Sequence, residues 1–398
     1  MTSGTGTRDV VVVSLEAWDD VWRRNQYLVD GLLQRDPGMR VLFVEPPRDR
    51  LHDLLTRRPS SRGLGTRVHP DRGGRLVLFQ PTKLLPRFVG GASDASWRRQ
   101  VLREVESLGM RRPLIWVNDT QGAEIVRARD WPAVYDVTDD WLAAPRPPRE
   151  LRRLARNEQI LLDRCIEVVV CSTALAESRG ANRAVRLIPN AVDVARYRHP
   201  FPRPSDLPAR AALYAGTLHE DRLDVELVAR CAEELGTDGS VVLVGPDALT
   251  ATSRETLVDA GALLLGPRPH TDVPAYLQHA DVLVVPHIVD RFTDSLDPIK
   301  LYEYQAAGKP VVSTPVAGFR DSEDPRVVVA LCDHFVAEVL NAVAEAVTAP
   351  SSDVDVSASD RAASRAQLTA IDWSDRVKLM AELIGRASVR SRRAGECS

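Results

Sequence analysis

Hydrophobic positions along the first half of the chain follow two alternating patterns. Short apolar runs bounded by polar residues, such as 10–13 and 40–44, alternate with longer stretches whose apolar residues recur every three or four positions, such as 19–38 with Leu28 and Leu32. The short runs predict buried strands, and the longer stretches predict amphipathic helices. Repetition of this strand and helix order predicts an α/β fold with a doubly wound parallel sheet.

The same alternation begins again at residue 211, after the proline-rich segment "RHPFPRPSDLPAR". We therefore predict two doubly wound domains facing each other across a cleft. Ligands of such sheets bind at the carboxyl ends of the strands, so functional residues are expected in loops that follow strands. The predicted segments are a disordered start at 1–8, a first domain at 9–195, a linker at 196–210, a second domain at 211–370, a helix at 371–388 that packs back toward the first domain, and a disordered tail at 389–398.

Bulk composition narrows the class of protein. The chain has 398 residues, 44% of them hydrophobic, and a formal net charge of -3 with both signs interleaved, so we expect no nucleic-acid partner. The five cysteines are scattered, which favours reduced thiols, and "MTSGTGTRD" does not resemble a secretion signal. We expect a cytoplasmic protein. The Asp353–Asp355 spacing has no strand before it, and we expect no metal site there.

One segment, "DPIKLYEYQAAGKPVVST" at 297–314, holds two of the chain's four lysines, Lys300 and Lys309. Asp297 is predicted to cap a helix that starts at Pro298, and Gly308 is predicted to end it in the left-handed conformation.

In that helix, Lys300 and Glu303 share a face near the amino end, where the helix dipole is positive. This arrangement suits a nucleoside diphosphate, with the ammonium and the helix start at the phosphates and the carboxylate at the ribose hydroxyls. A surface Lys/Glu pair is the simpler alternative. Lys309 follows the helix end and is expected only to complement its dipole.

This segment, together with "LGPRPHTDVPAYLQHADVLVVP" and "LIPNAVD" before it, resembles the nucleotide-sugar domain of bacterial GT-B glycosyltransferases. The N-terminal "WDDVWRRNQYLVDGLL" and "AVYDVTDDW" resemble the acceptor domain of members that build cell-envelope polysaccharides such as teichuronic acid. The resemblance implies that Glu303 binds the ribose, Lys300 the diphosphate and the Arg268 loop the base. The other implied donor contacts are Gly216, Thr217, His219, Arg222, Gly245, Ser295, Pro298 and Ile299.

Two positions depart from the pattern of this family. Ser295 stands where many retaining members carry a glutamate that orders the donor sugar, and Thr217 replaces the usual arginine of the phosphate loop. We therefore expect Lys300 to carry much of the phosphate charge, with Arg222 as a second cation. The stereochemical outcome stays open.

Carboxylates follow the apolar runs of the first domain. Asp136, Asp139, Asp140 and Asp119 should project at the carboxyl edge of the sheet, where one could accept the proton of an acceptor hydroxyl or orient that hydroxyl. Helix capping or solvation are the alternatives for these residues. Arg24 and Gln26 could contact the acceptor, and Trp18 could stack on a sugar, although each could instead only pack.

The predicted function is transfer of a sugar from a nucleoside diphosphate sugar, preferably a UDP-sugar, to a hydroxyl or amine of a natural product or envelope glycan. No cofactor or metal is expected. The alternatives are a sugar-nucleotide epimerase of the same fold and a non-catalytic partner protein that binds the nucleotide. Peripheral membrane association and the oligomeric state stay open.

Overall fold

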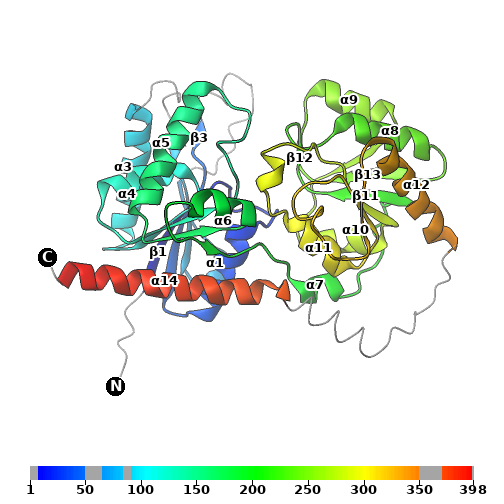
Figure 1. Ribbon diagram of the computed structural model, residues 1–398. Helices are drawn as coiled ribbons and strands as arrows, with labels where there is room; N and C mark the ends of the chain where they lie inside the picture. Colours follow the sequence, from blue (N-terminus) through cyan, green and yellow to red (C-terminus); the bar gives the residue numbers. More distant parts are fainter. Residues whose placement is uncertain (1–7, 50–64, 84–90, 349–369, 397–398) are drawn as a thin grey trace. The chain divides into compact units, whose positions relative to one another are not determined.

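The chain folds into two compact α/β units (Figure 1), and the computed structural model describes residues 8–49, 65–83, 91–348 and 370–396. The first unit contains residues 1–189 and 376–398, and the second contains residues 190–375. The predicted linker at 196–210 lies inside the second unit, where Tyr197 and Leu207 are buried in its core. The Asp353–Asp355 pair lies outside the described residues.

The first unit is built on a mostly parallel sheet with the strand order β10-β9-β8-β7-β1-β2-β5-β4, in which only β4 runs antiparallel to its neighbour. Its strands are β1 (Arg8–Val13), β2 (Met39–Val44), β4 (Gly65–Val68), β5 (Leu76–Gln80), β7 (Leu114–Val117), β8 (Ala133–Val137), β9 (Glu167–Val170) and β10 (Arg186–Leu187). A two-residue ladder joins β3 (Arg48–Asp49) to β6 (Thr82–Lys83).

Helices cover this sheet because the pattern of apolar residues gives each one a buried face. The helices are α1 (Arg24–Arg35), α3 (Gly91–Ser107), α4 (Ala123–Ala128), α5 (Pro148–Arg164), α6 (Thr173–Gly180) and most of α14 (Trp373–Glu396), with short 3-10 turns η1 (Pro70–Arg72) and η3 (Thr120–Gly122). Leu28 and Leu32, predicted as buried, are buried on α1. Helix α14 packs on α1, where Val377 lies against Gly31.

The second unit has a parallel sheet in the order β15-β13-β11-β16-β17-β18. Its strands are β11 (Ala211–Ala215), β13 (Ser240–Val244), β15 (Leu263–Gly266), β16 (Val282–Val285), β17 (Val311–Ser313) and β18 (Val327–Val329), with a small ladder of β12 (Leu218–His219) and β14 (Asp247–Ala248). Its helices are α7 (Val194–Arg198), α8 (Val225–Leu235), α9 (Ala251–Asp259), α10 (Val273–His279), α11 (Ile299–Ala307) and α12 (Cys332–Thr348), with the 3-10 turn η4 (Thr293–Ser295).

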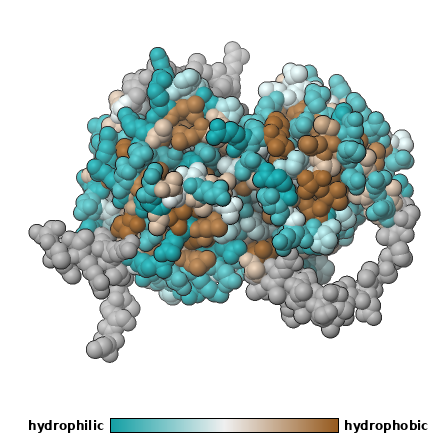
Figure 2. Space-filling model, in the orientation of Figure 1, coloured by the Kyte–Doolittle hydropathy of each residue, from teal (hydrophilic) through white to brown (hydrophobic). Residues whose placement is uncertain are grey.

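Both faces of this second sheet are packed. Along β11, Leu213 belongs to the cluster that includes α10 and α11, whereas Tyr214 belongs to the cluster that includes α8 and α12. This alternation is what a strand covered on both sides requires. In Figure 2 the visible surface of each unit is mainly hydrophilic, with smaller hydrophobic areas.

The end of the chain differs from the expectation. Helix α14 continues to Glu396, so the tail at 389–398, predicted to be disordered, is helical over most of its length. No helix within the described ranges is long and apolar enough to cross a bilayer.

Candidate functional site

Glycines end three neighbouring strands of the second sheet. Gly216, Gly245 and Gly266 follow or end β11, β13 and β15 with φ of +140°, +150° and +76°, a region that disfavours side chains. Gly216 N–H donates to Val244 O (2.8 Å), and Gly245 N–H donates to Gly266 O (2.9 Å). A Cβ on Gly245 would overlap the Gly216 carbonyl. The carboxyl edge of this sheet therefore carries no side chain at these three positions, and the close packing of Gly245 on Gly216 requires glycine.

Helix α11 begins beside this edge without a side-chain cap. Its N-cap is Pro298 and its first residue is Ile299, so the prediction that Asp297 caps the helix is wrong. Asp297 Oδ2 instead accepts from Asn190 N–H (2.5 Å), and its Oδ1 accepts from the Tyr302 hydroxyl (2.7 Å). The Asp297 carboxylate is thus bonded to Asn190, which lies 107 residues away in the sequence. The positive end of α11 is left to interact with an anion. Gly308 ends the helix with φ 73°, as predicted.

Lys300 projects from the first turn of α11 toward the glycine edge. A Cβ built on Gly216 would overlap Lys300 Nζ and lie 2.6 Å from its Cε. The ammonium lies 4.7 Å from the centroid of the Tyr214 ring, a cation–π contact. Two predicted donor residues, Gly216 and Lys300, are therefore in contact although 84 residues separate them.

Glu303 lies one turn further along the same face. Its Oε1 accepts a hydrogen bond from the Tyr197 hydroxyl (2.7 Å). Burial raises the pKa of its carboxyl, against the opposing effects of the Tyr197 hydrogen bond and the Lys300 charge. Glu303 as a whole residue is part-exposed, and one oxygen of its carboxylate is held by Tyr197.

His287, at the end of β16, is a residue of this site that sequence reasoning missed. Its Nε2 lies 3.1 Å from the Tyr214 hydroxyl, and the ring is buried. Burial, followed by the positive charges of Lys300 and Arg222 and by nearby His219, holds the His287 pKa well below its usual value. The only sequence signal was the position of a histidine after the apolar run "VLVVP".

Other predicted donor residues are placed as follows. Arg222 lies over the Phe292 ring, 5.0 Å from its centroid. Thr217 accepts from the Tyr214 hydroxyl through its carbonyl (3.3 Å). The Ser295 hydroxyl donates a hydrogen bond to Phe292 O (2.7 Å), within its own turn. This side chain is shorter than that of a glutamate and carries no negative charge.

Two basic residues lie outside this cluster. The Arg268 guanidinium pairs with Asp206 (2.6 Å) and donates to the Tyr276 hydroxyl (2.8 Å), so its side chain braces the loop. Lys309 interacts with Asp281, which binds Ala211 N–H at the amino end of β11. The second lysine is therefore at the opposite edge of the sheet.

In the first unit, Asp136 is completely buried in an ion pair. Both of its oxygens accept from Arg24 (3.1 Å each), and Trp116 Nε1–H also donates to it (3.2 Å). Arg24 is 3% exposed. The expected contact of Arg24 and Asp136 with an acceptor would require breaking this pair, so the structure gives both residues a structural role.

Three more predicted residues of this unit serve local structure. Gln26 accepts from Arg23 N–H (2.9 Å) in the capping box of α1 and is buried. Asp119 accepts from Gln121 N–H (2.8 Å) and caps η3. Trp18 packs edge to face on Phe43 with ring centroids 5.0 Å apart. Gln26 and Asp119 thus form capping contacts and Trp18 forms a packing contact, which were the alternatives to acceptor binding.

Asp139 and Asp140 follow β8, as predicted, but their surroundings differ. Asp140 is held by two hydrogen bonds from Arg179 (2.9 and 2.7 Å), and although burial raises its pKa, these bonds and the charge of Arg179 lower it overall. Asp139 Oδ2 accepts from the Thr138 hydroxyl (3.0 Å). A carboxylate bound twice by arginine is a poor proton acceptor, so the Asp140 carboxylate is poorly suited to act as a base.

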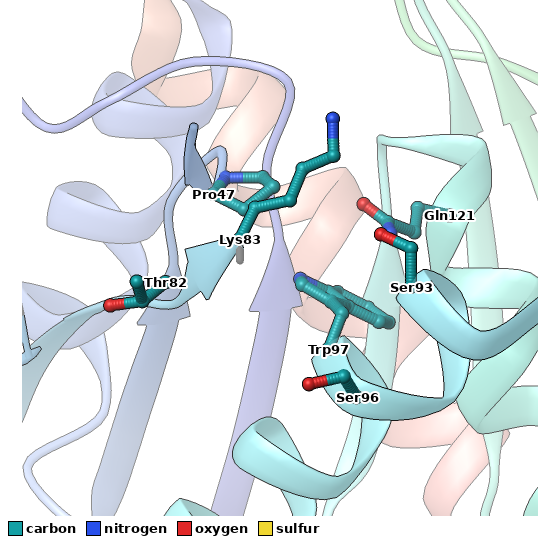
Figure 3. Close-up of a pocket in the computed structure, with 7 residues that line it drawn as sticks. All are labelled: Pro47, Thr82, Lys83, Ser93, Ser96, Trp97 and Gln121. Atoms are coloured by element: carbon teal, nitrogen blue, oxygen red, sulfur yellow. The ribbon is translucent and has the colours of Figure 1, made fainter. Parts of the chain in front are cut away.

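A small pocket of about 10 Å³ lies at the carboxyl edge of the first unit (Figure 3). Such a volume admits about one water molecule or one polar group of a ligand. Trp97 is 4% exposed and its buried Nε1–H has no partner within the part of the chain that the structure describes. None of the lining residues was predicted as a site residue: Pro47, Thr82, Lys83, Ser93, Ser96, Trp97 and Gln121.

Sequence comparison places a known domain on the second unit. Residues 209–348 match the family described as group 1 glycosyl transferases. A curated relative, a putative teichuronic acid biosynthesis glycosyltransferase of Bacillus subtilis (strain 168), is 24% identical over a match that covers 49% of this chain and 53% of the relative. The match thus spans about half of that relative's length.

Solved structures resemble the whole chain. The Anabaena protein HepE, solved with UDP and glucose, superposes with a TM-score of 0.63 at 15% identity and covers 95% of this chain and 99% of its own. WaaG, a glycosyltransferase of lipopolysaccharide biosynthesis, has a TM-score of 0.56 at 14% identity, with coverage of 96% and 98%. AviGT4, of avilamycin A biosynthesis, gives 0.54 at 17%, also with coverage of 96% and 98%. The chain therefore has the fold of the GT-B glycosyltransferases, and its residues 209–348 match the group 1 glycosyl transferase family.

Proposed function

We propose that this protein transfers a sugar from a nucleoside diphosphate sugar, with a UDP-sugar favoured, to a hydroxyl or amine acceptor. The observation that carries the proposal is the contact of the Lys300 ammonium with the Gly216 backbone at the uncapped start of α11. A cation, a helix amino end and bare glycine backbone together form a site for a diphosphate. The HepE structure, which contains UDP and glucose, supports the choice of nucleotide.

In the proposed reaction the bond between the sugar carbon and the diphosphate oxygen breaks, and the diphosphate leaves with the electron pair. The acceptor oxygen or nitrogen forms the new bond to that carbon and gives up its proton to a base or to the departing phosphate. Lys300 and the first N–H groups of α11 stabilise the negative charge that develops there, with Arg222 nearby as a second cation. Glu303 accepts hydrogen bonds from the ribose. Because the chain supplies these cations itself, the proposal requires no metal ion.

A thermal-shift screen with UDP, GDP and TDP, each with and without a chelator, tests the donor proposal. Only a nucleotide that binds the folded state stabilises it, by about 2.7 kcal/mol when present at 100 times its Kd. We expect UDP to raise the unfolding temperature equally with and without the chelator. No shift with any nucleoside diphosphate would refute the donor site, and consumption of a donor without an acceptor would indicate an epimerase.

On the acceptor side, we propose Asp139 as the group that accepts or orients the acceptor hydroxyl. Replacing Asp139 with Asn is expected to lower turnover about 100-fold or more, the usual contribution of a positioned base, without changing the UDP affinity. The matched variant Asp140→Asn should reduce turnover less, because Arg179 already holds that carboxylate. UDP release during transfer measures both. Equal turnover of Asp139→Asn and the unaltered enzyme would remove Asp139 from the mechanism.

A further inference from the structure

Lys300 rests on a buried aromatic ring that nothing in the donor chemistry requires. Its ammonium lies over the Tyr214 ring, and the ring is 1% exposed on β11. The hydroxyl of that tyrosine lies 3.1 Å from His287 Nε2 and donates to Thr217 O (3.3 Å). The backbone of His287 is held by Thr314. The His287 backbone N–H donates to Thr314 Oγ1 (3.2 Å), and the His287 carbonyl accepts from the same hydroxyl (2.7 Å).

We propose that Tyr214 and His287 are positioning residues, which hold the Lys300 ammonium at the Gly216 backbone before the donor diphosphate binds. This inference rests on the proposed donor site. A free lysine side chain loses rotamer entropy when it is ordered, and a ring that orders it in advance removes that cost from binding. Thr217, which follows Gly216, carries no charge, so the Gly216 backbone relies on Lys300 as its cation.

The surroundings of His287 fit this role. A protonated imidazole so close to Lys300 and Arg222 would repel both, and burial together with these charges lowers its pKa well below the usual value. A neutral ring can accept from or donate to the Tyr214 hydroxyl without adding charge. The pair therefore holds the ring under Lys300 and leaves the positive charge to the lysine.

The position of Lys300 can be measured without any ligand. The chain has four lysines, so a protein labelled with 13C only at lysine gives four CεH2 signals in an NMR spectrum. The signal lost in Lys300→Arg should lie upfield of the other three, because the Tyr214 ring current shields it. In Tyr214→Leu it should move to an ordinary lysine position. A Lys300 signal at an ordinary position in the unaltered protein, or unmoved in Tyr214→Leu, would overturn the inference.

The contribution of the contact between Tyr214 and Lys300 to UDP binding is tested by measuring UDP affinity in a double-mutant cycle. Tyr214→Leu should weaken UDP binding about 3- to 10-fold, the size of a cation–π contact, and should leave uridine binding unchanged. In a Lys300→Ala background the same substitution should cost less than about 2-fold, since its partner is gone. If the fold-losses in UDP affinity of the two single variants multiply in the double variant, Tyr214 acts independently of Lys300 and the proposal is overturned.

Milder variants separate positioning from a general packing role. Tyr214→Phe keeps the ring and removes its hydrogen bonds, and His287→Ala removes the other partner. We expect both to keep the folded state and to weaken UDP binding by a similar small factor, with no further loss when combined. A larger combined loss would contradict the pairing. If the unaltered protein binds no UDP, the donor proposal fails, whereas the lysine spectra still decide whether Tyr214 and His287 position Lys300.

Discussion

Replacing Asp136 with Asn is expected to lower the free energy of unfolding of the first unit by about 3–5 kcal/mol, the usual cost of leaving one member of a buried ion pair without its partner. Arg24 is 3% exposed and donates two hydrogen bonds to this carboxylate, so the buried guanidinium would lose the opposite charge that it pairs with. Urea unfolding followed by tryptophan fluorescence measures the loss, because Trp116 itself donates to Asp136.

Two comparisons sharpen this experiment. Asp130→Asn removes a carboxylate from an ion pair on the surface, with Arg112 at 3.5 Å, and should change stability little. The double variant Arg24→Met with Asp136→Leu removes both buried charges and should be more stable than either single variant. A loss below about 1 kcal/mol for Asp136→Asn would mean that water reaches the pair, and an acceptor-binding role would again be open.

Lys300→Ala is expected to weaken UDP binding about 10- to 100-fold, because a hydrogen bond to a charged group contributes about 1.5–3 kcal/mol. Uridine has no phosphate, so its affinity should stay the same. Isothermal titration with UDP and with uridine measures the difference. Equal losses for both ligands would show that Lys300 does not bind the diphosphate.

Lys309 provides the matched control. It lies nine residues after Lys300, and it interacts with Asp281 at the amino edge of the sheet. Lys309→Ala should therefore leave UDP binding unchanged. If both lysine variants lost the same affinity, the effect would come from net charge and not from a phosphate contact.

Much of the fold followed from local patterns. Apolar runs predicted the strands of both sheets except β4, and an apolar period of three to four residues predicted helices such as α1, because buried elements carry apolar residues at regular intervals. The shared face of Lys300 and Glu303 and the left-handed Gly308 were likewise local properties of one nine-residue helix.

Predictions about individual polar side chains were less successful. Asp297, Asp119 and Asp140 lie next to regular elements and Asp136 lies within β8, and each could cap, pair or face solvent on the evidence of its neighbours in sequence. Asp119 capped its own turn, whereas Asp297 and Asp136 found partners 107 and 112 residues away. Position after a strand thus indicated the edge of the sheet but not the partner.

The amino-acid sequence by itself determined the succession of elements, the glycine at the end of β11, and the common face of Lys300 and Glu303, because helix and strand periodicity depend on residues a few positions apart. Only the tertiary structure decided what surrounds them. Tyr214 and His287 are 73 residues apart, and Lys300 meets them because β11 and β16 end, and α11 begins, at one edge of the sheet. Such contacts depend on packing between distant segments, and this packing leaves no periodic signal in the chain.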